Sequence, residues 1–172
     1  MAQKIILDTD IGDDIDDAIA LSFAVRRPEL EVLAVTTCHL CTTERGRMAA
    51  KQLRLLHAEH IPWAPGPRLP LTPADEAARR KFATRVPFEY AFVREGEEVA
   101  PPAHHDAVEL QYDLICRHPG EVMLVPIGPL TNLATLFTRH PDAADKLKGI
   151  AMMGGDFPDP KREYNMACDP DA

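Results

Sequence analysis

Apolar and polar residues follow one another along the chain in blocks that predict strands and helices in turn. Short apolar runs are typical of buried strands, and they occupy residues 4–7, 30–36, 61–64, 122–127 and 150–153. Longer stretches with apolar residues at helical spacing predict helices at 14–27, 43–57, 106–117, from 131 onward and at 141–146. In the first of these helices, Ile15, Ile19 and Phe23 recur every four residues, and Pro28 ends the helix.

The alternation of strands and helices extends over the whole chain and predicts one α/β domain spanning residues 1–172. The expected architecture is an open, mainly parallel sheet with helices on both faces. Functional residues in such a fold gather at the carboxyl ends of the strands. Residues 70–102 fit the pattern least well, and we expect a short helix near 74–83 and then a proline-broken loop. The last 17 residues resemble a loop, with 169–172 beginning another helix.

The composition is that of an acidic globular protein. Hydrophobic residues make up 45% of the chain and charged residues 27%. The 19 basic and 27 acidic side chains give a net charge of −8, which argues against binding nucleic acid by phosphate neutralisation. No run approaches the roughly 18–20 apolar residues of a membrane helix, and the N-terminus lacks the apolar core of a signal peptide. We therefore expect a soluble, cytoplasmic protein that binds a small molecule rather than nucleic acid or a membrane.

Six aspartates follow the first predicted strand within ten residues: Asp8, Asp10, Asp13, Asp14, Asp16 and Asp17. If they lay close together without compensation, their mutual repulsion would be costly. Capping of the next helix, by Asp13 and Asp14, would explain only some of them. A bound divalent cation would explain the cluster, and oxygen ligands favour calcium or magnesium over zinc. The spacing is not that of an EF-hand, because a loop counted from Asp8 has Asp13 where glycine is needed and Ile19 where an acid is needed.

Several segments together resemble the nucleoside hydrolase (nucleoside N-ribohydrolase) family, in the family's order and over nearly the whole chain. They are Lys-Ile-Ile-Leu-Asp-Thr-Asp-Ile-Gly at 4–12, Asp-Asp-Ala-Ile-Ala-Leu at 16–21, Ala-Val-Thr-Thr at 34–37, Val-Pro-Ile-Gly-Pro-Leu-Thr-Asn-Leu-Ala at 125–134, Met-Met-Gly-Gly at 152–155, Glu-Tyr-Asn at 163–165 and Asp-Pro-Asp-Ala at 169–172. The resemblance implies a calcium-dependent glycosidase that hydrolyses the N-glycosidic bond of ribonucleosides to free base and ribose. Family members are nearly twice this long, so the chain resembles their N-terminal half.

The resemblance also implies roles for individual residues. Asp10 resembles the calcium ligand that acts as the base for water, and Asp17 and the main-chain carbonyl of Ile127 resemble further ligands. Asp16, Glu163 and Asn165 resemble the residues that bind ribose hydroxyls, and Asp8 would support the site from behind. Compared with the family pattern, this chain has two extra residues between Gly12 and the acidic pair Asp16-Asp17. If the family pattern is aligned on Gly12, Asp14 and Ile15 fall at the positions of the pair, and isoleucine cannot bind calcium. We therefore align the pattern on the helix that follows, which places Asp16 and Asp17 at these positions.

The chain departs from the family pattern in three places. Cys38-His-Leu-Cys41 stands where the family usually has a Gly-Asn or Gly-Asp turn, so that ribose contact is lost or comes from Thr42. The His-Gly element of the family's flap is not evident in 82–102. The family's catalytic His-Asp pair belongs to the half that this chain does not match; His104-His105-Asp106 precedes a predicted helix, where an N-cap is expected. Without the other half of the family's fold, the apolar surface that packs against that half would be exposed. Self-association into a homo-oligomer would cover this surface.

Two other functions are compatible with these motifs. The chain can be a half-domain that binds calcium or ribose without turnover. Alternatively, Ile-Ile-Leu-Asp8-Thr-Asp10 resembles the first motif of haloacid-dehalogenase-type phosphatases, with Asp8 as nucleophile, Asp10 as acid/base and Asp156 and Asp159 in a late magnesium motif. Six clustered carboxylates would, however, repel a phosphate.

The four cysteines are expected to be free thiols in a cytoplasmic chain. Cys38 and Cys41, with His57 and His60, give a C-x2-C-x15-H-x2-H pattern. The gap between the two histidines is shorter than zinc fingers use, which argues against a zinc site.

Overall fold

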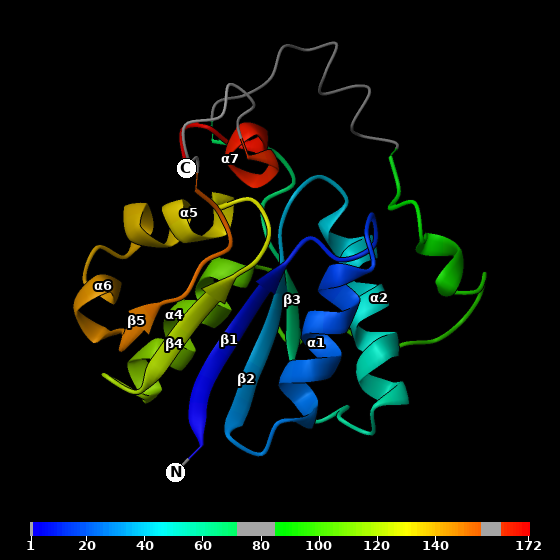
Figure 1. Cartoon of the computed structure of the whole chain (residues 1–172), viewed down its shortest axis with the longest axis horizontal. Helices are drawn as coiled ribbons and strands as arrows, with labels where there is room; N and C mark the ends of the chain where they lie inside the picture. The colour runs from blue at the N-terminus through cyan, green and yellow to red at the C-terminus, as the bar shows by residue number, and fades with distance from the viewer. Residues whose placement is uncertain (1, 72–84, 156–162) are drawn as a thin grey trace.

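The computed structural model describes residues 2–71, 85–155 and 163–172 (Figure 1). Five strands form one sheet in the order β3-β2-β1-β4-β5, and every neighbouring pair is parallel. The strands are β1 (Gln3–Thr9), β2 (Leu30–Thr37), β3 (Trp63–Pro65), β4 (Val122–Pro126) and β5 (Gly149–Ile150). The predicted open parallel sheet is therefore confirmed.

Helices cover both faces of this sheet, as predicted. The helical elements are α1 (Asp16–Arg26), α2 (Thr42–Leu55), the 3-10 helix η1 (Tyr90–Phe92), α4 (Ala107–Arg117), α5 (Thr131–Arg139), α6 (Ala143–Lys146) and α7 (Tyr164–Cys168). Successive strand residues point to opposite faces. Accordingly, Leu7 packs in a core with residues of α1 and α2, whereas Ile6 packs in a second core with residues of α4 and α5.

The apolar stripe that predicts α1 does not face the core. Ile19 and Phe23 are each 60% exposed, whereas Leu21 and Ala24 of the same helix are buried. The helix packs on β2 and α2 through its other side. Ile19 and Phe23 of the stripe instead line an apolar groove beside β1 and β4, together with Met123. An apolar helical period thus identified the helix correctly but not the side that is buried.

The C-terminal part of the chain differs most from expectation. The predicted helix at 169–172 is wrong, because the helix is α7, which ends at Cys168. Glu163 explains the earlier start, since its carboxylate caps α7 by accepting hydrogen bonds from the backbone N–H groups of Asn165 and Met166. Asp169 is buried and accepts a hydrogen bond from the Thr131 hydroxyl at 2.6 Å. The strand predicted at 150–153 ends at Ile150. The helix predicted near 74–83 lies outside the described residues.

The topology brings distant parts of the sequence to one edge of the sheet. β1 and β4 lie side by side, with Asp8 paired to Pro126. The Ile127 N–H continues this pairing by donating to the Asp8 carbonyl at 2.8 Å. The residues that follow the two strands therefore meet at their carboxyl ends, where ligands bind in open α/β sheets. None of the helices in the described ranges is long and apolar enough to span a bilayer.

Candidate active site

A cavity of about 260 Å³ lies at the carboxyl ends of β1 and β4. Its lining includes the six residues to which the family resemblance gives a calcium-binding or ribose-binding role: Asp10, Asp16, Asp17, Ile127, Glu163 and Asn165. These residues come from the loop after β1, the start of α1, the loop after β4 and the start of α7. The structure thus brings together side chains that are up to 155 positions apart in the chain, from Asp10 to Asn165.

Asp10 and Asp17 are two poorly solvated carboxylates in this cavity. Burial raises the pKa of Asp10 to about 6, and the nearby Arg45 guanidinium opposes that rise. Burial, with the like charge of Asp10, raises the pKa of Asp17 to about 7. The Thr9 hydroxyl donates a hydrogen bond to Asp17 at 2.5 Å, which ties the start of α1 to the end of β1. A cation between these carboxylates would relieve the unfavourable charge.

Asp8 lies behind the cavity. It is 1% exposed, and one carboxylate oxygen accepts hydrogen bonds of 2.6 Å from the Thr36 hydroxyl and the Asn132 amide. Gln111 donates to the same Thr36 hydroxyl at 2.8 Å. Burial raises the pKa of Asp8 to about 7. A carboxylate enclosed in this way supports the strand ends and is shielded from an incoming phosphoryl group, so it is poorly suited to be a nucleophile.

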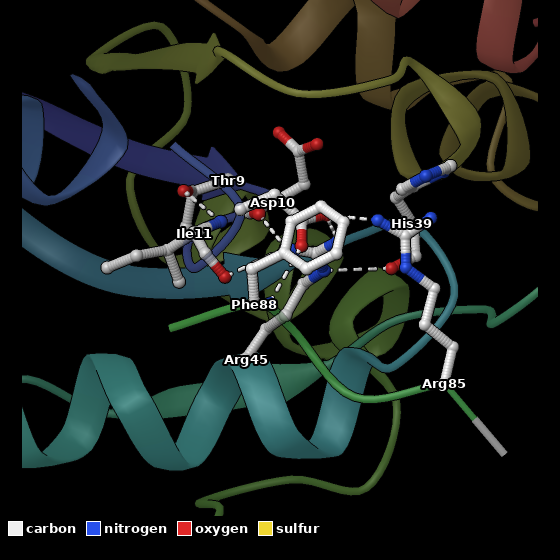
Figure 2. A network of polar contacts seen from close by, with 8 residues as sticks. Thr9, Asp10, Ile11, His39, Arg45, Arg85 and Phe88 are labelled. Carbon is white, nitrogen blue, oxygen red and sulfur yellow. Dashed lines mark hydrogen bonds and ion pairs between the residues drawn. The ribbon is translucent and has the colours of Figure 1, made fainter. Parts of the chain in front are cut away.

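Asp13 is an anchor rather than a helix cap, contrary to the sequence-based expectation. The N-cap of α1 is Ile15, and no side chain caps the helix. The Asp13 carboxylate instead accepts hydrogen bonds from Arg45 at 2.7 Å, from Arg85 at 3.2 Å and from the Phe88 N–H at 3.1 Å. Figure 2 shows Arg45, Arg85 and Phe88 gathered at this point. The two guanidinium groups outcompete the helix N-terminus for this carboxylate because they offer full positive charges.

The opposite wall of the cavity carries Glu163 and Asn165. Glu163 caps α7, so its carboxylate is held in place while keeping free lone pairs. The Asn165 side-chain amide donates to the Ile127 carbonyl at 2.9 Å. Asp16 is exposed at the cavity, and its carboxylate makes no hydrogen bond to the described part of the chain. These groups present hydrogen-bond acceptors to the cavity, as binding of a polyhydroxylated ligand requires.

The donors around the cavity fit a hard cation in kind. They are carboxylate and carbonyl oxygens, which calcium prefers. Within residues 2–71, 85–155 and 163–172, however, no three carboxylate, imidazole or thiol side chains converge on one point. Asp10, Asp17 and the Ile127 carbonyl would therefore supply part of a calcium shell, and water or substrate oxygens would supply the rest.

Several residues at the site had no role assigned to them from the sequence. Arg85, Phe88, Met153 and Tyr164 also line the cavity, and Arg45 lies beneath it. A lone arginine within a helical segment gives no sequence signal of such a contact. Conversely, His104-His105-Asp106 lies elsewhere: Asp106 caps α4 and pairs with Arg139 at 2.6 Å. Cys38 and Cys41 are buried free thiols. The Thr42 hydroxyl donates its proton to the Gly66 carbonyl at 2.9 Å, so that proton is not available to a ribose oxygen in this conformation.

Comparison with known proteins decides the lineage of the chain. The sequence model described as "Inosine-uridine preferring nucleoside hydrolase" matches residues 5–172. The chain belongs to this family. Because Asp8 is also enclosed, membership favours the hydrolase interpretation of the Asp-Thr-Asp motif over the phosphatase alternative, whose Asp156 and Asp159 lie outside the described residues.

Individual nucleoside hydrolases resemble the chain from end to end. The non-specific ribonucleoside hydrolase RihC of Escherichia fergusonii is 34% identical over 178 residues, covering 100% of this chain and 57% of that protein. The plant nucleoside hydrolase PpNRh1 superimposes with a TM-score of 0.80 at 29% identity, covering 99% of this chain and 55% of that one. The purine-preferring ribonucleoside hydrolase from Gardnerella vaginalis gives a TM-score of 0.76 at 25% identity, over 98% and 55% of the two chains. The chain therefore spans little more than half the length of these relatives.

The raised pKa values predict how pH acts on this nucleoside hydrolase chain. Asp8, Asp10 and Asp17 bind protons more tightly in the folded than in the unfolded state, since their folded pKa values of about 7, 6 and 7 exceed the usual 3.8. Their contribution to stability is complete below about pH 4 and is lost as pH rises through about 6 to 7. We expect the Tm of the calcium-free protein to fall between about pH 5 and pH 8, measured by thermal denaturation.

Calcium should act in the opposite direction over the same interval. Metal binding requires ionised carboxylates, so the rise in Tm caused by calcium should grow with pH. Asp8→Asn removes one titrating group without touching the cavity and should flatten the pH dependence of the calcium-free protein. A Tm that climbs from pH 5 to pH 8 without calcium would contradict the assignment.

Proposed function

We propose that this chain binds the ribose of a ribonucleoside, with calcium, and hydrolyses its N-glycosidic bond to free base and ribose. The observation that carries the proposal is the shared cavity of Asp10, Asp16, Asp17, Glu163 and Asn165 in a member of the nucleoside hydrolase family. RihC is a non-specific ribonucleoside hydrolase and the Gardnerella vaginalis relative is a purine-preferring ribonucleoside hydrolase, and both names support this substrate class.

The residues of the cavity suit the chemistry of this bond. Cleavage passes through a ribosyl oxocarbenium ion, which carries positive charge next to the ring oxygen. Asp16, Glu163 and Asn165 would hold the ribose hydroxyls, and the carboxylates would offset the developing charge. Asp10, whose pKa is about 6, is ionised at neutral pH and would accept a proton from the attacking water. Calcium held by Asp10, Asp17 and the Ile127 carbonyl would orient that water and the ribose diol.

Ribose release tests the proposal. The purified chain is incubated with inosine and with uridine, first with calcium and then with EDTA. We expect release that EDTA abolishes. Loss of release and of calcium-induced stabilisation together would overturn both the catalytic and the metal-binding parts of the proposal.

Terbium, a luminescent substitute for calcium, tests the place of the metal. Tyr164 lines the cavity and is 60% exposed, so a terbium ion bound there should show tyrosine-sensitised emission. Tyr164→Phe should remove most of that emission while leaving the affinity for calcium unchanged. Emission that survives this substitution would place the ion elsewhere.

A second candidate function is binding of calcium or ribose without turnover. No histidine lines the cavity in the described part of the chain, so no acid for the leaving base is evident there. His39 packs edge-to-face against Tyr164, but burial lowers its pKa to about 4, so it is neutral at pH 7. Stabilisation by calcium without ribose release would favour this function. Self-association of the chain stays a prediction from the sequence.

A further inference from the structure

Arg45 of α2 lies beneath the candidate active site, and its guanidinium donates hydrogen bonds to the loops that form the site. Its side chain is 0% exposed. One terminal nitrogen donates to the carbonyls of Asp10 and Ile11, the latter at 2.9 Å, and Nε donates to the His39 carbonyl at 2.9 Å. The other terminal nitrogen donates to the Asp13 carboxylate at 2.7 Å. Figure 2 shows the guanidinium between the backbone of residues 9–11 and that of His39.

These acceptors belong to two different loops. Asp10, Ile11 and Asp13 follow β1, whereas His39 follows β2. The second loop has an unfavourable backbone, because His39 and Leu40 have φ angles of 64° and 61° and neither is glycine. Such a conformation persists only where its surroundings fix it. The hydrogen bond from Arg45 to the His39 carbonyl is one such restraint, and the Leu40 N–H, which donates to the Arg68 carbonyl at 2.9 Å, is another.

The Asp10 side chain lies close against the backbone of Gly128. An added Cβ on Gly128 would lie 2.5 Å from an Asp10 carboxylate oxygen and 3.0 Å from the Asp10 backbone nitrogen. Asp10 is therefore held between the guanidinium below it and the Gly128 backbone beside it. A small movement of the loop after β1 would reorient its carboxylate.

Asp13 extends the same network to the rim of the cavity. Besides Arg45, it accepts from Arg85 and from the Phe88 N–H, and both of these residues line the cavity. The Arg85 guanidinium also lies 5.0 Å from the centre of the Phe88 ring. The buried arginine is thus connected through one carboxylate to the segment 85–88.

We propose that Arg45 is a positioning residue: its guanidinium fixes the backbone of Asp10 against the loop after β2 and, through Asp13, holds residues 85–88 at the rim of the cavity. Burying the charge of Arg45 costs free energy, so its ion pair with Asp13 is weak evidence that the residue stabilises the fold. A role in positioning the loops accounts for the buried arginine better. A guanidinium has donors fixed in several directions, which suits three carbonyls and a carboxylate. The ammonium of a lysine is a single point that cannot reach them all.

The test compares Arg45→Met and Arg45→Lys with Leu53→Ala. Leu53 is a buried core residue of the same helix, so its variant controls for lost stability. Because the inference rests on the proposed calcium site, the first measurement is calcium affinity by calorimetry, at a temperature where each variant is folded. Both Arg45 variants should bind calcium at least about tenfold more weakly, as expected for loss of an outer-shell partner. Leu53→Ala should stay within about twofold.

The second measurement needs no metal. Hydrogen exchange of the calcium-free protein should be faster at residues 10–13 and 38–41 in the Arg45 variants, but not in Leu53→Ala beyond its global change in stability. Asp13→Ala should speed exchange only near 85–88. If wild-type chain binds no calcium, the proposed function fails, and hydrogen exchange alone decides the inference. Wild-type exchange rates in Arg45→Lys, restored calcium affinity in that variant, or an equal loss in Leu53→Ala would overturn it.

Discussion

Asp10→Asn and Asp17→Asn should each abolish calcium binding. Each substitution removes one of the two carboxylates proposed as calcium ligands. No third carboxylate, imidazole or thiol side chain of the described residues converges with them on one point to replace the lost ligand. An amide oxygen is a neutral and weaker ligand for a hard cation. Calorimetric titration with calcium should therefore show no binding in the range where the unsubstituted chain saturates, and ribose release should be lost as well.

Asp13→Asn is the matched control. Asp13 lies in the same aspartate cluster, but its carboxylate is already occupied by Arg45, Arg85 and the Phe88 N–H. We expect it to change calcium affinity only a few-fold. If Asp13→Asn abolishes binding while Asp17→Asn does not, the acidic pair was matched to the family in the wrong register.

Gly46→Ala should destabilise the fold by about 2 kcal/mol or more. Gly46 lies inside α2, where alanine alone would gain about 1 kcal/mol in helix propensity. An added Cβ, however, would lie 2.0 Å and 2.2 Å from two carbons of the Trp63 ring. The indole cannot yield easily, since it is 2% exposed and its N–H donates to the Ala100 carbonyl at 2.9 Å. Overpacking costs about 1 to 3 kcal/mol and occasionally more. Contacts as short as these call for the upper end of that range or beyond, so a net loss of about 2 kcal/mol or more remains after the gain in helix propensity.

Urea unfolding measures this difference, and Gly149→Ala provides the comparison. At Gly149 the added Cβ would meet only the Met123 side chain, at 3.3 Å, and a methionine end can move aside. Gly149→Ala should therefore change the free energy of unfolding by less than about 1 kcal/mol. Equal effects of the two substitutions would mean that α2 can shift away from Trp63.

The sequence alone determined most of the elements and part of the cavity lining. Alternating strands and helices require a parallel sheet, because each crossover returns the chain in the same direction, and functional residues then follow strand ends. That rule placed Asp10 at the carboxyl edge of the sheet, the resemblance to the family added Ile127, and both residues line one cavity. The family motifs added Glu163 and Asn165, which no local pattern connects to the aspartates.

Only the tertiary structure shows that the aspartates of the cluster have different surroundings and therefore different roles. Asp8, Asp13 and Asp17 are equivalent in sequence, yet one is enclosed by Thr36 and Asn132, one is paired with Arg45 and one faces the cavity. The partners come from β2, α5 and α2, far along the chain, and a carboxylate's role depends on which charges and donors reach it. The same holds for α1, where helical spacing shows an apolar stripe but the packing of α2 and β2 determines which side is buried.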